Sequence, residues 1–411
     1  MIPGDRFVPW LGVLPDAWKI RPLKHVVRFN PDVLEEDTDP GRVIRYVDIS
    51  TVDSQGRMGK PEEMTFFDAP SRARRVVQSG DVIVSTVRTY LTAISRIDAD
   101  GLTVSTGFAV LRPRTNVDSR FLGYWMRSQY IVDEIVARST GVSYPAVNPT
   151  EIGQLPFPMI NADQQHVIAD FLDRETTRID LLVEDYRRLI ELLNEEVASL
   201  ALSSMDSATT LRLGNAATIV SRPVIQKEGE LYTPIGLFNR GRGLFHKDPR
   251  EKDDMGDSDF FWIEEADLVI SGQFAWEGAI ALAGKEDSGC VVSHRYYVLR
   301  GRDGATLTEY LLALLSTKHG DFLLNENSRG AAGRNRPLNI NSLLKEKIPV
   351  PDLPAQEMVA KAVHRRIRVL SETSNQIGRL QAYRSALISA AVTGQIDVRK
   401  YRPQEAAALC Q

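Results

Sequence analysis

Side chains that could build a metal or catalytic centre are few in this sequence, and their spacing does not suit one. The histidines are His25, His166, His246, His294, His319 and His364. None of them forms the H-E-x-x-H pattern that places two imidazoles on one helix face to bind zinc. The two cysteines, Cys290 and Cys410, lie far apart. This argues against a disulfide or a cysteine metal site, and it predicts a reduced, cytoplasmic setting.

The signatures of nucleotide binding and of DNA chemistry are also missing. A P-loop is not formed, because Gly284-Lys285 follows Gly278 one residue too late and Glu286 stands where Ser or Thr is needed. The N/D-P-P-aromatic run of adenine methyltransferases is approached only by Asn30-Pro31-Asp32 and Asn148-Pro149-Thr150. No glutamate is followed two positions later by lysine, as in the E-x-K of many restriction nucleases. These absences predict that the chain is not an enzyme and binds no cofactor or metal itself.

The sequence contains one domain-sized unit used twice. Residues 101–114, GLTVSTGFAVLRPR, match residues 289–302, GCVVSHRYYVLRGR, at seven of 14 positions. Upstream, SGDVIVS at 79–85 faces EADLVIS at 265–271. A third block aligns Pro156, Pro158 and Gln164 with Pro349, Pro351 and Gln356. Three blocks in the same order, with offsets that drift only from 186 to 193, predict a duplication rather than a short-period solenoid.

Both copies are predicted to contain the same series of elements. Runs of β-branched and aromatic residues predict strands at 82–84, 108–111, 268–270 and 296–299. A short helix follows each strand group, at 120–137 and at 307–324. A glycine-rich polar loop comes next, and then a P-x-P motif that cannot be helical.

A long helix is predicted to end each copy, at about 162–204 and 355–392. Apolar residues recur mostly at alternating steps of three and four, from Ile168 to Leu200 and from Val359 to Ala391. This spacing is typical of a coiled-coil seam. A helix of about 40 residues is roughly 60 Å long. A narrow seam favours pairing of the two helices with each other; packing of each helix on its own globular unit is the alternative.

Three segments together resemble a known family. They are Trp18-Lys19-Ile20-Arg21-Pro22-Leu23, then Pro349-Val350-Pro351-Asp352-Leu353-Pro354-Ala355-Gln356-Glu357, and SALISAAVTGQID at 385–397. With the duplication, they resemble the specificity subunit of type I restriction–modification systems over almost the whole chain. The corresponding start of the second copy, Leu211-Arg212-Leu213, departs from the pattern because it lacks the tryptophan.

The resemblance implies an α+β fold with a pseudo-twofold internal repeat, in which two α/β target-recognition domains are separated by two long antiparallel coiled-coil helices. The expected boundaries are 1–160 for the first recognition domain, 161–205 for the central helix, 206–354 for the second recognition domain, 355–397 for the distal helix and 398–411 for a tail. Each domain would read one half of a two-part DNA site, and helix length would set the unread gap between the halves.

The resemblance also implies the partners. Two modification subunits, which methylate adenine with S-adenosylmethionine, would dock on the helices, and restriction subunits using ATP and Mg²⁺ would join them. Double-stranded DNA is the expected ligand, and no membrane is expected, because no apolar run approaches about 18 residues. The net charge of −4 and pI of about 6.0 argue mildly against DNA binding, although a basic face can exist beneath an acidic average.

Candidate DNA contacts lie in the loops before the P-x-P motifs and in segments that diverge after Ser85 and Ser271. An arginine cluster at 72–75 and an arginine pair at 240–242 are further candidates for phosphate contacts. Glycine permits close backbone approach, while Ser, Thr and Arg donate to phosphates and Arg and Asn can contact base edges. In the first copy the candidates are Arg72, Arg74, Arg75, Arg88, Tyr90, Ser139, Thr140, Gly141, Ser143, Tyr144 and Asn148. In the second they are Arg240, Arg242, Trp276, Ser328, Arg329, Arg334, Asn335 and Arg336. An ordinary polar surface is the alternative for these residues, and a buried core position is the alternative for Trp276.

Two other functions remain open at this point. One is a methyltransferase that carries its own recognition domains, and the other is a two-armed coiled-coil scaffold that does not bind DNA. Methylation by the chain alone would indicate the first. Failure to retain DNA in the presence of the modification partner would indicate the second.

Overall fold

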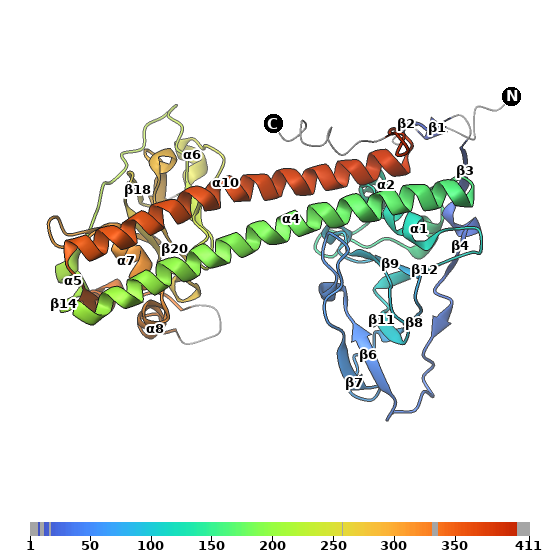
Figure 1. Cartoon of the computed structure of the whole chain (residues 1–411), viewed down its shortest axis with the longest axis horizontal. Coiled ribbons are helices and arrows are strands. Elements are labelled where there is room, and N and C mark those ends of the chain that lie inside the picture. Colours follow the sequence, from blue (N-terminus) through green and yellow to red (C-terminus); the bar gives the residue numbers. More distant parts are fainter. Residues whose placement is uncertain (1–6, 9–11, 16–17, 257, 331–335, 401–411) are drawn as a thin grey trace. The chain divides into compact units, whose positions relative to one another are not determined.

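The protein was analysed as a computed structural model, which describes residues 7–8, 12–15, 18–256, 258–330 and 336–400. The chain forms two compact units. Unit 1 comprises Met1–Val183 with Ile377–Gln411, and unit 2 comprises Glu184–Gln376. Each unit holds one copy of the repeat and one part of each long helix, as the colours along the chain in Figure 1 show.

The two units contain the same four-stranded antiparallel sheet. In unit 1 the strand order is β10 (Ile94–Arg96), β9 (Val82–Ser85), β12 (Phe108–Pro113) and β4 (Val27–Phe29). In unit 2 it is β20 (Ile280–Leu282), β19 (Leu268–Ser271), β22 (Tyr296–Gly301) and β15 (Ala217–Ile219). The register is also the same, because Phe108 lies opposite Ser85 and Tyr296 lies opposite Ser271. The four strands predicted from the sequence are therefore the two central strands of each sheet.

Outside this sheet the two copies differ. Unit 1 adds a five-stranded sheet in the order β5 (Asp32–Val33), β8 (Ala73–Val77), β11 (Leu102–Ser105), β6 (Val43–Val47) and β7 (Glu62–Thr65). Unit 2 has instead the pairs β16 (Ile235–Leu237) with β17 (Leu244–His246) and β18 (Phe260–Trp262) with β21 (Val291–Ser293). Single helical turns punctuate the loops: η1 (Leu23–His25), η2 (Ile49–Thr51), η3 (Thr89–Leu91), η4 (Ser204–Ser207), η5 (Ala275–Glu277), η6 (Lys285–Asp287), α5 (Leu213–Ala216) and α6 (Lys252–Met255).

The P-x-P segments are short strands, each paired with the start of its copy. β13 (Pro156–Met159) pairs with β3 (Lys19–Pro22), and β23 (Lys347–Val350) pairs with β14 (Thr209–Arg212). A further pair, β1 (Phe7–Val8) with β2 (Gly12–Val13), precedes β3. Beside β3, Trp18 is buried and lies against Gly394, so the beginning of the first copy contacts the end of the distal helix within unit 1.

The structure corrects the sequence alignment of this third block. The Gln165 amide donates to the Ile160 carbonyl (3.0 Å), and its oxygen accepts from the Asp118 N–H (2.9 Å). Gln356 makes the same two bonds, to the Pro351 carbonyl (2.8 Å) and from the Leu307 N–H (2.8 Å). The counterpart of Gln356 is therefore Gln165 and not Gln164. The two residues lie 191 positions apart, and that offset places Pro158 opposite Pro349.

The helices predicted at 120–137 and 307–324 are each two helices. Unit 1 has α1 (Ser119–Met126) and α2 (Gln129–Ala137), and unit 2 has α7 (Thr308–Leu315) and α8 (Lys318–Glu326). Ser128 and Thr317 cause the breaks, because their hydroxyls donate to the Trp125 and Leu314 carbonyls at 2.7 Å. Such local bonds compete with helix continuation. After the polar loop, one further turn precedes each P-x-P strand: α3 (Pro149–Gly153) and α9 (Ile340–Leu343).

A buried carboxylate joins the central strands of each sheet. Asp81 is fully buried, and Arg112 reaches its two oxygens with Nε and Nη2 at 2.8 Å. In unit 2, Asp267 is equally buried and accepts from Arg300 Nε (2.5 Å) and Arg222 Nη1 (2.7 Å). A charge removed from water must be paired and hydrogen-bonded, so this contact fixes how the two strands meet.

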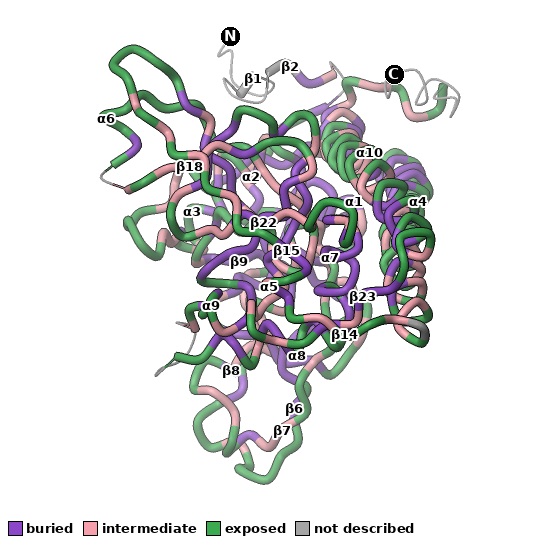
Figure 2. Tube along the Cα trace, turned by 90° about the vertical axis from the view of Figure 1, so that its left-hand side faces the viewer, coloured by how far each residue is buried: buried purple, intermediate pink, exposed green. Residues whose placement is uncertain are grey.

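The long helices α4 (Ala162–Ser203) and α10 (Leu353–Val392) run antiparallel where they meet inside each unit. In unit 1, Arg384 Nε lies 3.0 Å from Asp180 Oδ1. In unit 2, Asn194 and Glu196 on α4 bond to Arg366 and Arg365 on α10. Residue numbers therefore rise along one helix as they fall along the other, and helix pairing is confirmed. Buried, intermediate and exposed residues alternate along both helices (Figure 2).

The same helices also pack on the sheets, so the alternative packing is present as well. Ile168 and Leu172 of α4 belong to one core with Trp125 and Phe157, whose rings meet edge-on at 6.2 Å. In unit 2, Val359 and Val363 of α10 join a core with buried residues of α7 and β19. None of the helices in the described ranges has the hydrophobic length that a membrane span requires.

Replacing Asp81 with Asn is expected to lower the free energy of unfolding of the first sheet by about 3 kcal/mol, because Arg112 stays charged and buried without its main counter-ion. Hydrogen exchange of the β9 and β12 amides measures the change. Asp53→Asn is the matched control, since Asp53 pairs with Arg57 at an exposed position and such pairs contribute at most about 1 kcal/mol. Equal exchange rates in the two variants would contradict a structural role for the buried pair.

Candidate nucleic-acid interface

The residues that diverge between the copies lie in two loops that each unit holds together. We call residues 86–92 and 272–278 loop A, and residues 138–147 and 327–338 loop B. Loop A leaves the central strand β9 or β19, and loop B follows α2 or α8. In unit 1 the Val147 N–H donates to the Thr86 carbonyl (2.9 Å), and in unit 2 the Leu338 N–H donates to the Gly272 carbonyl (2.8 Å). The same backbone bond therefore brings loops A and B together in both copies.

Loop A ends in a left-handed residue in each copy. Thr92 has φ of 53° and its counterpart Gly278 has φ of 68°. Arg88 in the first copy is left-handed too, with φ of 49°. Residues other than glycine rarely adopt this conformation, and it costs roughly 1–2 kcal/mol at each position. Two such residues in one five-residue turn indicate that the first copy holds loop A in a shape that its sequence does not favour, as functional loops often do.

Loop B anchors loop A of the first copy at three further points. The Arg88 N–H donates to the Pro145 carbonyl (2.7 Å), and the hydroxyls of Thr89 and Ser139 are 2.7 Å apart. The Arg88 guanidinium lies over the Tyr144 ring, 4.6 Å from its centroid. In the described part of the chain, no group accepts a hydrogen bond from this guanidinium, so its donors remain available at an exposed position.

An exposed surface surrounds this stack. Tyr90 is 55% exposed and Tyr144 65% exposed, although both are aromatic. Thr140, Gly141 and Ser143 of loop B are also exposed. The structure thus brings together six of the predicted residues of the first copy with Ser139, which is half-buried. Asn148 ends this surface, and its side chain caps α3 by accepting from the Thr150 N–H (3.0 Å).

The predicted arginine cluster of the first copy adjoins loop A through one turn. The Thr106 N–H donates to the Arg72 carbonyl, and the Thr86 N–H of loop A donates to the Gly107 carbonyl, both at 2.8 Å. Only part of the cluster is free. Arg72 pairs with Asp48 at 2.8 Å, which raises the pKa of its guanidinium. Arg74 covers the Phe66 ring at 4.4 Å, and burial lowers the pKa of Arg75.

The second copy forms the same kind of stack with the residue types exchanged. Trp276 belongs to loop A and lies under the guanidinium of Arg336 from loop B, 5.0 Å away. Here the arginine is already bonded, since its Nε donates to the Ser328 carbonyl (3.0 Å) and its Nη2 to the Asn325 carbonyl (3.5 Å). Arg336 therefore closes the end of α8, whereas the guanidinium of Arg88 has no hydrogen-bond acceptor among the described residues.

The structure does not support every predicted contact of the second copy. Ser328 is fully buried, so its hydroxyl is not on the surface. Arg329 is exposed but pairs with Glu326. Arg334 and Asn335 lie outside the described residues, and the predictions for them stay open. Arg240 and Arg242 occupy the tip of the β16–β17 hairpin, where Arg240 is left-handed with φ of 61°.

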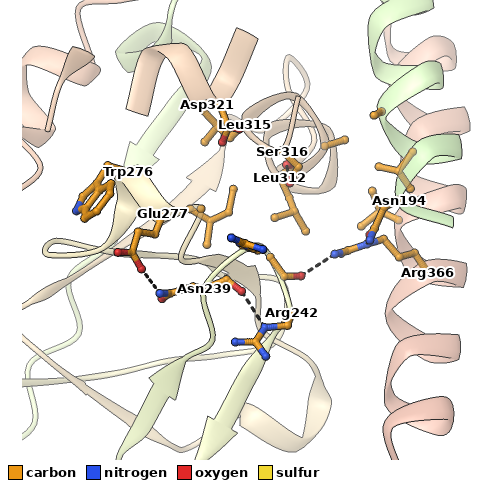
Figure 3. Close-up of a pocket in the computed structure, with 18 residues that line it drawn as sticks. Asn194, Asn239, Arg242, Trp276, Glu277, Leu312, Leu315, Ser316, Asp321 and Arg366 are labelled. Atoms are coloured by element: carbon orange, nitrogen blue, oxygen red, sulfur yellow. Dashed lines mark hydrogen bonds between the residues drawn. The ribbon is translucent and has the colours of Figure 1, made fainter. Parts of the chain in front are cut away.

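Figure 3 shows that this hairpin tip, Trp276 and the long helices surround one cavity. Its volume is about 930 Å³. Arg366 of α10 crosses to the hairpin and donates to the Gly241 carbonyl (2.6 Å). Sequence reasoning missed Arg366 and Asn194, because both lie in helices whose heptad pattern presents them as ordinary coiled-coil positions. Only the fold shows that one of them points toward a recognition domain.

Comparisons with solved structures identify chains that have a similar fold. One similar chain, from a structure described as the structural basis underlying complex assembly and conformational transition of the type I R-M system, has a TM-score of 0.53 and 22% identity. The match covers 93% of this chain and 99% of that one. The type I restriction–modification S subunit from M. genitalium has a TM-score of 0.51 and 15% identity, over 91% of this chain and 96% of that chain.

The HsdS subunit from Thermoanaerobacter tengcongensis, 23% identical, also aligns over 93% of this chain and 98% of its own, with a lower TM-score of 0.43. No protein-family model matches the sequence, and no curated protein matches it. The chain therefore shares the fold of type I specificity subunits, and the fold class expected from the sequence is confirmed: two sheet-bearing regions with two long antiparallel helices.

Exchanging residues at the left-handed position of loop A is expected to give effects of opposite sign. Gly278→Ala should lower the free energy of unfolding by about 1 kcal/mol, because alanine is strained at positive φ even though a Cβ there meets only atoms at 3.4 Å or more. Thr92→Gly should raise it by up to about 1 kcal/mol by removing that strain. Denaturant unfolding measures both changes.

The control is Gly378→Ala, which adds a Cβ with no neighbour within 4 Å in the middle of helix α10. This change should stabilise the protein by about 1 kcal/mol through helix propensity. Destabilisation by Thr92→Gly would show that the left-handed turn is not strained.

Proposed function

We propose that this chain is the non-catalytic DNA-recognition subunit of a type I restriction–modification enzyme. Each unit reads one half of a two-part double-stranded DNA site. The observation that carries the proposal is a repeated sheet, with identical strand order and register, that presents loop pairs of different sequence. A conserved scaffold with diverged exposed loops suits two readers of different base sequences.

The chemistry of the loops supports DNA as the ligand. Exposed tyrosines, a glycine that permits close backbone approach, and hydroxyls suit contacts to sugars and phosphates. A guanidinium that lies over an aromatic ring, and whose donors no described residue occupies, suits a bidentate contact to guanine O6 and N7. Arg88 in the first copy has this geometry. Arg336 differs, because its Nε and Nη2 already donate to the Ser328 and Asn325 carbonyls, so the two half-sites are read by different means.

The long helices supply a surface for protein partners. On α4, Leu181 and Leu182 in unit 1 and Leu189 and Leu192 in unit 2 are exposed although they are apolar. Contiguous exposed apolar side chains mark protein interfaces. We assign this face to two modification subunits, which methylate adenine, with restriction subunits joining that assembly. S-adenosylmethionine, ATP and Mg²⁺ then belong to the partners.

The proposal predicts that modification subunits methylate DNA at a two-part motif only when this chain is present. Purified modification subunit with and without the chain, followed by sequencing of methylated adenines, measures this. The chain alone should show no methylation. Activity of the chain alone would instead indicate a methyltransferase with its own readers. Absence of DNA retention by the complex at low salt would indicate a scaffold that does not bind DNA.

Arg88→Ala is expected to make one base position in one half-site degenerate and to leave the other half-site intact. Loss of a bidentate contact should reduce discrimination at that position by about 10- to 100-fold. Sequencing the sites methylated by the variant complex measures the effect. Tyr144→Phe keeps the ring under Arg88 and should leave the motif unchanged.

Arg72→Ala is the matched control, since it removes an arginine next to loop A that is already paired with Asp48. It should weaken binding evenly across sequences, or not at all, without altering the motif. An unchanged motif in the Arg88→Ala variant, with normal methylation by the wild type, would exclude base reading by Arg88.

A further inference from the structure

Unit 2 contains a cavity at the joint between its recognition domain and the helix pair. It is lined by the hairpin tip, loop A, α7 and the facing sides of α4 and α10 (Figure 3). Its volume of about 930 Å³ is at the upper end of the range of small-ligand sites. All of the lining residues belong to unit 2, so the cavity is a property of this unit alone.

The repeat explains why the cavity is open. Helices α1 and α7 correspond at an offset of 189 residues, which places Ala313 where the first copy has Tyr124 and Ser316 where it has Arg127. In unit 1 the Arg127 guanidinium covers the Tyr124 ring (4.8 Å) and donates to the hairpin carbonyl of Gln55 (3.0 Å). The second copy replaces these two large side chains with small ones that line the cavity.

A buried cation faces this space without a counter-ion. Arg366 is only 9% exposed, and its hydrogen bonds go to neutral acceptors, the Asn194 amide oxygen and the Gly241 carbonyl. Among the described residues no carboxylate pairs with it. In unit 1 the buried Arg384 is paired with Asp180. An unpaired buried charge is costly, and burial accordingly lowers the pKa of Arg366.

The other charged groups around the cavity leave it positive. Arg240 and Arg242 line its hairpin side, and Arg242 is held there by donating to the Asn239 carbonyl (3.0 Å). Two carboxyls also line it. They are Glu277, which is bonded to the Asn239 amide, and Asp321, whose pKa burial raises; the three arginines Arg240, Arg242 and Arg366 outnumber them.

We propose that the unit 2 cavity binds a phosphate-class oxyanion. The anion is the counter-ion of Arg366, and Arg240 and Arg242 contribute further positive charge. The Asn194 amide adds a polar group that suits such a ligand, whereas the hydroxyl of Ser316, at the C-terminal end of α7, already donates to the Leu312 carbonyl (2.7 Å). The source of the phosphate is either a free small anion or the DNA backbone, and both present the same chemistry.

The test uses the full-length chain and inorganic phosphate in isothermal titration at constant ionic strength. Saturable binding is expected in the wild type. The double variant Ala313→Tyr, Ser316→Gln fills the cavity with side chains of first-copy size and no added charge. It is expected to weaken phosphate binding at least about tenfold by excluding the ligand.

A second variant tests the proposal without filling the cavity, so its result does not depend on how introduced side chains pack. Arg366→Gln should weaken phosphate binding about 10- to 100-fold, the range for loss of a charged hydrogen bond. Arg365→Gln is its matched control, because this neighbouring arginine is half-exposed and pairs with Glu196. It removes the same charge from the same helix turn and should bind phosphate as the wild type does.

A measurement with DNA distinguishes the two sources of the phosphate. Duplex affinity of the complex with modification subunits is compared between the wild type and the filled variant. A matching loss would place a backbone phosphate in the cavity, whereas a loss confined to inorganic phosphate would identify a free anion. The proposal is overturned if the wild type binds neither ligand through the cavity, or if both variants bind phosphate as tightly as the wild type. The proposal would also be overturned if the filled variant or Arg366→Gln impaired binding of the modification subunit but bound phosphate as the wild type does.

Discussion

A buried carboxylate at the start of the central strand organises each half of this protein. Asp81 and Asp267 are fully buried, and Arg112 and Arg300 reach them from the neighbouring strand. Because neither charge tolerates burial alone, each pair fixes the register of β9 with β12 or of β19 with β22. That register determines where the strand ends, and therefore where loop A begins. Loops A and B differ between the copies, but their position depends on a carboxylate–arginine pair that both copies contain.

Conservation of the scaffold contrasts with divergence in loops A and B. The Thr86 and Gly272 carbonyls accept the same backbone bond from loop B, but the stack above them uses an arginine from loop A in one copy and from loop B in the other. Exchanging the partners preserves the packing of a cation on a ring. It changes which guanidinium donors the described residues leave unbonded, so one framework presents two different sets of donors.

Sequence alone predicted the features that local pattern encodes. The strands around Val82 and Leu268 and the long helices were predicted, because β-branched runs and heptad spacing reflect burial directly. The breaks at Ser128 and Thr317 were not, since one side-chain bond outweighs an otherwise helical pattern. The alignment of Gln164 with Gln356 was wrong by one residue, because a short motif with repeated prolines fits more than one register.

The joints between each sheet-bearing region and the helices could not be derived from sequence, because they combine residues far apart in the chain. In unit 1 the Gln55 carbonyl accepts from Arg127, which follows α1, and in unit 2 the Gly241 carbonyl accepts from Arg366 of α10. The acceptor is backbone in both, so no residue type identifies it. In unit 1 Arg127 and Gln55 both lie before the long helices, and it is Arg384 of α10 that reaches the Gln55 side chain (3.4 Å). In unit 2 Arg366 of α10 makes the contact itself, and no large side chain of a described residue fills the space that Arg127 fills in unit 1. An arginine of α10 therefore contacts the sheet-bearing region in each unit, and the residues around it decide whether a cavity remains beside it.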